Sequence, residues 1–201
     1  MEVNPYLSAA ERGILGRAVV GIAGAGGLGS NCAMHLVRSG VRRLVIADFD
    51  RVAESNLNRQ FFFADQIGCR KVEALGRNLR RIVPELELEL HDSAVTAENA
   101  AGRFGRCDIV VEAFDSSAAK QMLIRTMLAC GKTVVAASGL GGWGKSNGLR
   151  LRRMAGGRLY LAGDFESGVE TGAARPFSPR VGIAAAMEAN TVIALLLGEE
   201  P

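Results

Sequence analysis

Short apolar runs alternate along this chain with longer segments whose apolar residues recur at helical spacing. The short runs predict buried strands at residues 18–23, 44–48, 108–113 and 133–137. The polar and apolar alternation of residues 86–90 predicts a half-exposed strand. The longer segments predict helices at residues 30–39, 67–83, 96–104 and 117–130, with Ser117 as the N-cap of the last one. This alternation is typical of right-handed βαβ units.

The pattern changes after residue 138. Residues 149–153 and 158–162 flank the glycine turn 155–157 and predict a hairpin. Residues 139–144 and 163–180 predict loops, and residues 181–197 predict an apolar closing helix. The predicted fold class is therefore α/β: a Rossmann-like, doubly wound, mostly parallel sheet that a C-terminal antiparallel hairpin extends. We expect residues 1–201 to form one domain.

Composition excludes several classes of function. The 201 residues are 48% hydrophobic, carry a formal net charge of +3 and have scattered arginines, so we expect no nucleic-acid partner. There is no N-terminal signal and no uninterrupted apolar run long enough for a bilayer, so we expect no membrane association and a cytoplasmic location. Four widely spaced cysteines without a CxxC pair predict neither a zinc site nor a disulfide framework: Cys32, Cys69, Cys107 and Cys130.

A glycine-rich turn lies where the first predicted strand meets the first predicted helix, and it contains Gly24, Gly26, Gly27, Leu28 and Gly29. Glycines there permit close backbone approach to a phosphate, and the helix N-terminus offers N–H groups to the anion. Asp48 ends the second strand, where a carboxylate binds ribose hydroxyls. Such turns also arise for packing alone, but strand, helix and acid in register predict a nucleotide site.

A second group of polar residues follows the second strand: Ser55, Asn56, Arg59, Gln60 and Lys71. A triphosphate under attack needs such cations, because charge develops on the α-phosphate and pyrophosphate leaves as a polyanion. Asp115, just past a central strand, suits a magnesium ion. Taken singly, these residues are better explained as a solvated loop, a helix-surface lysine and a helix cap; together they favour the functional interpretation.

These motifs together resemble the adenylation domain of the ubiquitin-activating-enzyme superfamily, whose bacterial members include ThiF and MoeB. The resemblance rests on residues 24–29, 48–50, 55–60, 71–73 and Asp115, and it runs from about Leu15 to the end of the chain. It implies ATP- and magnesium-dependent adenylylation of the C-terminal Gly-Gly carboxylate of a ubiquitin-like sulfur carrier protein. Pyrophosphate is the second product.

The resemblance also implies a role for each matching residue. Gly27 belongs to the phosphate loop and Asp48 to the ribose contact. Asn56, Arg59 and Lys71 contact the ATP phosphates. Asp115 holds the magnesium ion, so Arg59, Lys71 and Asp115 form the catalytic set. The remaining lining of the ATP site is Gly24, Gly26, Leu28, Gly29, Asp50, Ser55, Gln60 and Ser116.

The chain departs from the family pattern in three places. Longer relatives bind zinc through two CxxC pairs, whereas this chain has no cysteine beyond Cys130, so no zinc is expected. The crossover loop, residues 163–180, lacks the cysteine that would form a covalent link to the carrier. Arg12 is the N-terminal arginine that stands nearest to one that relatives supply across a dimer. The compact chain is most similar to ThiF-type proteins of thiamine biosynthesis, which implies a ThiS-like carrier.

Other functions stay open. Activation of a molybdopterin sulfur carrier, as in MoeB, or tRNA modification by another superfamily member would use the same ATP residues. An NAD-binding oxidoreductase would use the glycine turn and Asp48 but would leave Arg59 and Lys71 unexplained. A non-catalytic binding module would keep the fold. We also expect a homodimer built from the hairpin and residues 181–197, because that helix is apolar nearly all round; burial against its own sheet is the alternative.

Overall fold

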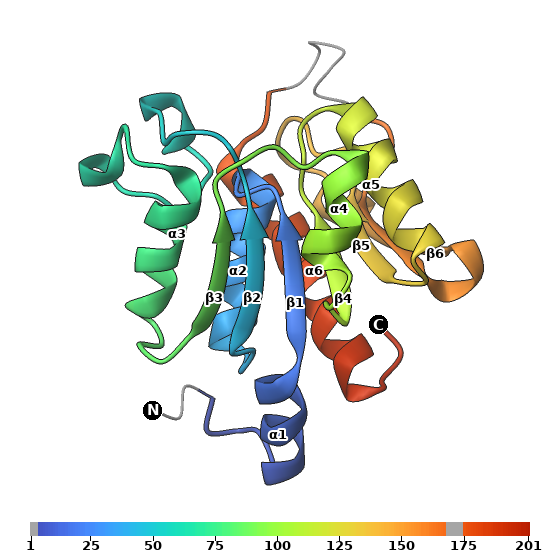
Figure 1. Cartoon of the computed structure of the whole chain (residues 1–201). Coiled ribbons are helices and arrows are strands. Elements are labelled where there is room, and N and C mark those ends of the chain that lie inside the picture. The colour runs from blue at the N-terminus through green and yellow to red at the C-terminus, as the bar shows by residue number, and fades with distance from the viewer. Residues whose placement is uncertain (1–3, 168–174) are drawn as a thin grey trace.

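The computed structural model describes residues 4–167 and 175–201 (Figure 1). Within these ranges, one sheet has the strand order β3-β2-β1-β4-β5-β7-β6. All neighbours pair in parallel except β6 and β7, so the predicted mostly parallel α/β sheet with an antiparallel hairpin is confirmed. The strands are β1 (Val19–Ala23), β2 (Arg43–Ala47), β3 (Glu87–His91), β4 (Ile109–Glu112), β5 (Thr133–Ala137), β6 (Arg150–Met154) and β7 (Leu159–Gly163).

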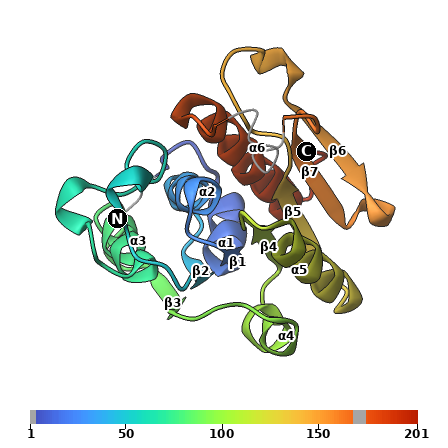
Figure 2. The ribbon, with the colours of Figure 1, turned by 90° about the horizontal axis from the view of Figure 1, so that it is seen from above.

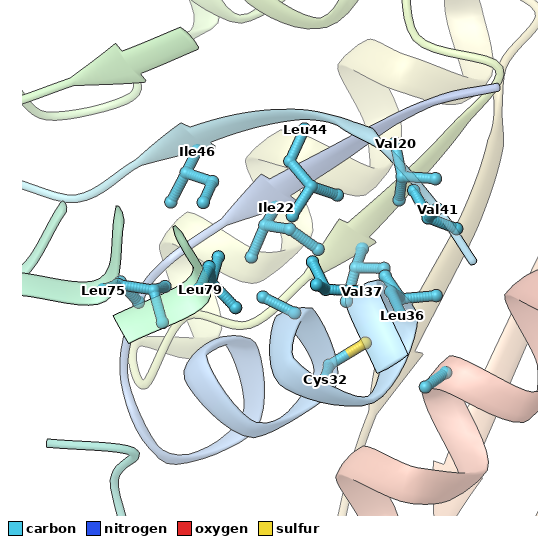
Figure 3. Close-up of a cluster of buried hydrophobic side chains, with 14 of the residues drawn as sticks. Val20, Ile22, Cys32, Leu36, Val37, Val41, Leu44, Ile46, Leu75 and Leu79 are labelled. Atoms are coloured by element: carbon cyan, nitrogen blue, oxygen red, sulfur yellow. The ribbon is translucent and has the colours of Figure 1, made fainter. Parts of the chain in front are cut away.

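Helices cover both faces of the sheet (Figure 2). One face carries α2 (Gly27–Arg38), α3 (Lys71–Arg80) and α6 (Ser178–Leu197). The other carries α4 (Ala97–Phe104) and α5 (Ser117–Ala129). Figure 3 shows the core beneath α2, where aliphatic side chains of β1 and β2 pack against α2 and α3. This core fixes the start of α2 above the end of β1, and that junction contains the glycine motif.

Three helix boundaries differ from the predicted ones. Helix α2 begins at Gly27 instead of residue 30, so the last glycines of the motif lie in its first turn. Helix α3 covers only Lys71–Arg80, because Gly68 adopts φ +86° and Cys69 accepts a backbone bond from Val52. Helix α6 begins at Ser178, with proline in its first turn, where the missing N–H costs no helical bond.

One helix was not predicted. Helix α1 (Ala9–Arg17) has a weak apolar stripe, which explains why hydrophobic spacing missed it. Its sequence signal is a capping box: Ser8 Oγ accepts from Glu11 N at 3.3 Å, and Ser8 N donates to Glu11 Oε2 at 2.7 Å. Arg12 in this helix donates to the carbonyl of Leu7.

The hairpin extends the sheet at one edge, beyond β5. Strand β7 pairs in parallel with β5 and antiparallel with β6, so only β6 is the antiparallel edge. Part of the predicted loop 163–180, residues 168–174, lies outside the described residues. Gly163 ends β7 and residues 178–180 begin α6, so residues 164–167 and 175–177 are the described part of the connection. Helix α6 is long and apolar enough to cross a membrane by length and composition. It nevertheless packs along α2 and carries the buried charged residues Arg180 and Glu188, as expected for a core helix.

Candidate nucleotide-binding site

The glycine motif forms a tight junction at the carboxyl end of β1. Gly24 adopts φ +100°, and a Cβ added there would lie 2.6 Å from the carbonyl oxygen of Ala113. A Cβ added at Gly29 would overlap the carbonyl oxygen of Gly24. The N-cap of α2 is Gly26, which has no side-chain oxygen to occupy the free N–H groups of the first turn. The motif thus presents unpaired backbone donors, as an anion site requires.

This junction lies at the switch point of the sheet. Strand β1 pairs with β2 on one side and with β4 on the other, and Ala23 is in register with Ala47 and Glu112. The chain leaves β1 toward β2 and later returns through β4 on the opposite side, which makes this the switch point where open α/β sheets bind ligands; we call the region between the two carboxyl ends the nucleotide crevice. The sequence-predicted residues near β2 and the predicted metal ligand after β4 therefore flank one crevice.

Asp48 joins the glycine motif to β2. Its Oδ2 accepts from Ala25 N at 2.6 Å, and its Oδ1 accepts from Asp50 N at 2.8 Å. The side chain is half-buried, and each carboxylate oxygen has a second lone pair. Asp48 therefore positions the loop and can still accept from a ribose hydroxyl.

The buried Lys71 pairs with the exposed Asp50. Its Nζ lies 2.7 Å from Asp50 Oδ2, and its backbone N donates to Asp50 O at 2.9 Å. Only 5% of Lys71 is exposed, so the interpretation as a helix-surface lysine is wrong. A lysine ammonium has three protons, so two donors remain for another anion. Sequence analysis named both residues but missed that they pair.

Arg59 lies over the start of α2. A Cβ added at Gly27 would be 3.5 Å from Arg59 Cγ, so the arginine stem covers the first helical residue. Its Nη1 donates to Asn58 Oδ1 at 2.8 Å and to Ser55 O at 3.2 Å. Ser55 itself is exposed. The guanidinium has five donors, so it keeps several for a phosphate.

Asn56 and Gln60 shape the same segment. Asn56 Oδ1 accepts from Ala53 N at 3.1 Å and caps a short 3₁₀ turn, Glu54–Asn56. Gln60 is buried, and within the described residues its Oε1 has no hydrogen-bond partner. A Cβ added at Gly26 would lie 3.9 Å from Gln60 Nε2, so this amide borders the glycine motif. An unpartnered amide oxygen at that place suits a ligand donor or an ordered water.

Two residues that the sequence analysis did not name tie the site together. Asn31 Nδ2 donates to Gly27 O at 2.7 Å and to Arg59 O at 2.9 Å. Ser30 Oγ donates to Gly26 O at 2.6 Å and accepts from Phe61 N at 3.0 Å. The sequence signal for these contacts is a polar residue four positions after Gly26 and another four positions after Gly27, because a helical side chain reaches the carbonyl four residues back.

Asp115 and Ser116 follow β4 on the far side of the crevice. Ser116, not Ser117, is the N-cap of α5: its Oγ accepts from Ala119 N at 3.4 Å. The predicted cap was therefore wrong by one residue. Asp115 is exposed, and its charge helps to raise the pKa of Glu112. One exposed carboxylate fits magnesium, which completes its oxygen ligands with phosphate and water. Within the described residues, no group of three His, Cys, Asp or Glu residues could hold a metal alone.

A buried acid lies beneath Asp115. Glu112 ends β4 with no exposed surface, pairs with Lys120 and accepts from Phe114 N at 2.7 Å. Burial raises the pKa of Glu112, and Lys120 opposes that rise. The strand was predicted to be buried, but no role was assigned to the acid within it or to the lysine eight residues later.

Comparison with known proteins agrees with this geometry. The model of the ThiF family matches residues 5–201. Ubiquitin-like modifier-activating enzyme 5 of Drosophila ananassae is 41% identical over 85 residues, covering 42% of this chain and 22% of the relative. Adenylyltransferase and sulfurtransferase MOCS3 of Anopheles gambiae is 33% identical over 127 residues, covering 63% and 29%. The chain thus spans less than a third of the length of these curated relatives.

Solved structures share the fold. The tRNA N6-threonylcarbamoyladenosine dehydratase TcdA of E. coli, in complex with ATP, has a TM-score of 0.86 at 20% identity, covering 94% of this chain and 90% of that one. E. coli MccB with ATP has a TM-score of 0.73 at 20% identity, covering 92% and 57%. At this identity the likeness shows the fold alone.

Proposed function

This chain belongs to the ThiF family, and on that premise we propose that it is an adenylyltransferase that uses ATP to activate the C-terminal carboxylate of a ubiquitin-like sulfur carrier protein. The observation that carries the proposal is the crevice at the switch point. There the glycine motif follows β1, the Asp50–Lys71 pair and the Arg59 segment follow β2, and the exposed Asp115 follows β4 on the other side of β1. A dehydrogenase would need only the glycine motif and Asp48.

Different groups of residues contact different parts of ATP in this proposal. The N–H groups at the start of α2 receive phosphate oxygens, and Asp48 accepts from the ribose. Arg59 and Lys71 contribute positive charge where negative charge grows during transfer. Magnesium, when bound beside Asp115, would neutralise phosphate charge.

The chemistry needs no side-chain nucleophile. The carrier carboxylate is already ionised at neutral pH, and one of its oxygens forms a bond to the α-phosphorus. The bond between that phosphorus and the bridging oxygen breaks, and pyrophosphate leaves with the electron pair. The residues of the crevice therefore act by positioning and by charge.

ATP–pyrophosphate exchange tests this function. We expect exchange only when magnesium and a carrier ending in Gly-Gly are both present. No exchange with any sulfur carrier of the source organism would reject the proposal. Exchange driven by free amino acids would assign a different acyl substrate, and binding of NAD without ATP would favour an oxidoreductase.

The finer assignment is a ThiS-like carrier for thiamine thiazole synthesis in the cytoplasm. Its support is the resemblance of residues 138–143 and 179–185 to ThiF-type proteins. Comparing exchange with ThiS-like and molybdopterin-type carriers separates this role from a MoeB-like one. Exchange with neither carrier, together with ATP-dependent modification of tRNA, would favour the tRNA-modifying alternative. Zinc is not part of the proposal, and metal analysis should find none in stoichiometric amount.

A homodimer is also part of the proposal. Helix α6 keeps apolar surface exposed: Ile183 is 37% exposed, and Ile193 and Leu196 are only partly buried where they pack against the core. A symmetric partner would cover them. Sedimentation equilibrium at micromolar concentration should give twice the chain mass of 21.2 kDa; a mass of one chain would reject the dimer.

A further inference from the structure

A cavity of about 440 Å³ lies between the hairpin and the loop that follows β5. It is separate from the nucleotide crevice and is lined by residues 141–152 and 164–167 and by the start of α6; we call it the hairpin cavity. Its volume is within the range typical of ligand sites, roughly 300–1,000 Å³. Its lining residues are Gly141, Trp143, Lys145, Gly148, Arg150, Arg152, Asp164, Phe165, Glu166, Ser167 and Arg180.

The lining carries more positive than negative charge. Lys145, Arg150, Arg152 and Arg180 contribute four cations, against the carboxylates of Asp164 and Glu166. The pairing of Asp164 with Arg180 cancels one charge of each sign. What remains is three cations and one exposed carboxylate. Sequence analysis found the arginines scattered; the hairpin brings them to one place.

One wall of the cavity is rigidly built. Arg180 is 5% exposed, donates from Nη1 to Gly144 O at 2.7 Å and pairs through Nη2 with Asp164. Its Nε is buried without a partner among the described residues. Asp164 also accepts from Ser167 N at 2.8 Å and Glu166 N at 2.9 Å. A buried guanidinium N–H without an acceptor is a donor that an incoming group can use.

The other walls hold aromatic rings. Arg152 lies 3.8 Å over the ring of Phe165, which has φ +66°. Lys145 is also left-handed, with φ +47°, so two of the three such non-glycine residues described line this cavity. Trp143 is 76% exposed and meets Phe177 edge-on at 5.1 Å. Side chains held in this costly backbone conformation, with an exposed tryptophan, indicate a surface prepared for contact.

The cavity opens at the same edge of the sheet as the nucleotide crevice. Strands β1, β4, β5 and β7 are parallel, so the residues after each of them meet at one edge. The loop 139–144 that follows β5 contains four glycines, and a Cβ on Gly139 would overlap Asp164. A thin chain can pass such a loop toward the crevice.

We propose that the hairpin cavity binds an acidic segment of the carrier protein, located upstream of its Gly-Gly end, and selects carriers by that charge. This inference rests on the proposed function. Arg150 and Arg152 pair with the acidic side chains, Arg180 Nε donates to the segment, and the tail continues along residues 139–144. Opposite charges on two partners raise the rate of association and reject partners of like charge.

Two features favour a polypeptide over nucleic acid. Glu166 lies in the lining and would repel a phosphate backbone, whereas a peptide with spaced acids can avoid it. The walls are a buried donor and aromatic rings within one concave volume, instead of a long basic track.

The test uses fluorescein-labelled ten-residue peptides that end in Gly-Gly and differ only in carrying Asp and Glu or Asn and Gln upstream. Anisotropy measures their binding to the full chain, to R150E/R152E and to the matched control R153E. Arg153 lies on the same strand but does not line the cavity. The variant R150Q/R152Q removes the two charges without reversing them, in case R150E/R152E does not fold. Thermal melts show whether each variant is folded.

We expect the acidic peptide to bind the wild type, and R150E/R152E to weaken binding roughly tenfold or more, with R153E changing it less than about twofold. Equal binding of the acidic and amide peptides, or equal binding by R150E/R152E, would overturn the proposal. Tighter binding of a tRNA through the same arginines would also overturn it, in favour of nucleic acid.

Pyrophosphate exchange in the same samples separates the two proposals. Charge-selective peptide binding without exchange means that the adenylyltransferase function fails and the cavity remains a site for acidic peptides. Carrier-dependent exchange whose KM for the carrier is unchanged in R150E/R152E means that the cavity proposal alone fails.

Discussion

The nucleotide crevice and the hairpin cavity lie at the same edge of the sheet but are held in different ways. In the crevice, the backbone itself sets the geometry: Gly24 and Gly29 lie so close to neighbouring carbonyls that no side chain fits. In the hairpin cavity, side chains from distant segments set it, as in the pairing of Arg180 with Asp164 and the contact of Trp143 with Phe177. An added methyl group should therefore disrupt the structure of the crevice. The removal of a charge should disrupt the structure of the cavity.

Alanine at Gly29 should have the largest effect. Its Cβ would overlap the carbonyl oxygen of Gly24, so we expect a loss of about 3 kcal/mol or more of unfolding free energy and no measurable ATP binding. The matched control is Gly182→Ala in α6, where a Cβ meets nothing within 4 Å. There we expect a gain of about 0.5–1 kcal/mol, because alanine is the better helix former. Urea unfolding and calorimetric ATP titration measure both; equal effects would contradict the backbone argument.

Asp115→Asn should separate catalysis from stability within the crevice. We expect exchange to fall by about 10²–10³-fold, the scale of one lost electrostatic contact to the transition state. Because Asp115 is exposed, the unfolding free energy should change by less than about 0.5 kcal/mol. Asp65→Asn, another exposed carboxylate, is the control. Lys71 is unsuitable for this test, because it is itself buried and its removal also breaks its ion pair with Asp50. Normal turnover in the Asp115 variant would remove this residue from the catalytic set.

Asp164→Asn should damage the hairpin cavity and spare the crevice. It leaves the buried Arg180 without its counter-ion, so we expect a loss of about 2–3 kcal/mol of unfolding free energy at neutral pH. ATP affinity should stay within about twofold of the wild type, because no hydrogen bond or ion pair of Asp164 described here involves the glycine motif. A large loss of ATP affinity would show that the two regions are coupled.

The same variant has a predicted pH dependence. Burial alone would raise the pKa of Asp164, but hydrogen bonds from Ser167 and Glu166, together with Arg180, lower it to about 2 from 3.8. Its stabilising contribution is therefore complete above about pH 4 and is lost as the pH falls toward 2. Urea unfolding at several acidic pH values should show the wild type and the variant converging.

Glu188→Gln should act in the opposite direction and raise stability. Glu188 is fully buried in α6, and neither carboxyl oxygen has a hydrogen-bond partner among the described residues. Burial raises its pKa well above the ordinary value; Glu112 adds to the rise and Lys120 opposes it. The contribution of Glu188 to stability is then most favourable below pH 4.5 and declines as the pH rises above that value. The glutamine variant should match the wild type near pH 4 and exceed it at pH 8; a less stable variant at pH 8 would show that the carboxylate has a partner.

Residues close together in sequence determined most of what could be predicted. Apolar periodicity located the parallel strands and the helices behind them, because a strand or helix must bury one face. The glycine motif, Asp48 and the residues around Arg59 were identifiable because backbone geometry and phosphate chemistry restrict which residues can stand there. The predicted start of α3 was wrong, since a local turn at Gly68 overrides apolar spacing.

Tertiary structure alone decided which of these residues meet. Lys71 and Asp50 are 21 positions apart, yet they form one ion pair, and Asn31 reaches Arg59 across 28 positions. The sequence names such groups but cannot say that a sheet edge brings them within hydrogen-bond distance. The same is true of the hairpin cavity: Arg150 and Arg152 are neighbours on β6, but only the tertiary structure brings them to the same cavity as Arg180. The physical reason is that side-chain contacts depend on strand order, which local propensity does not encode.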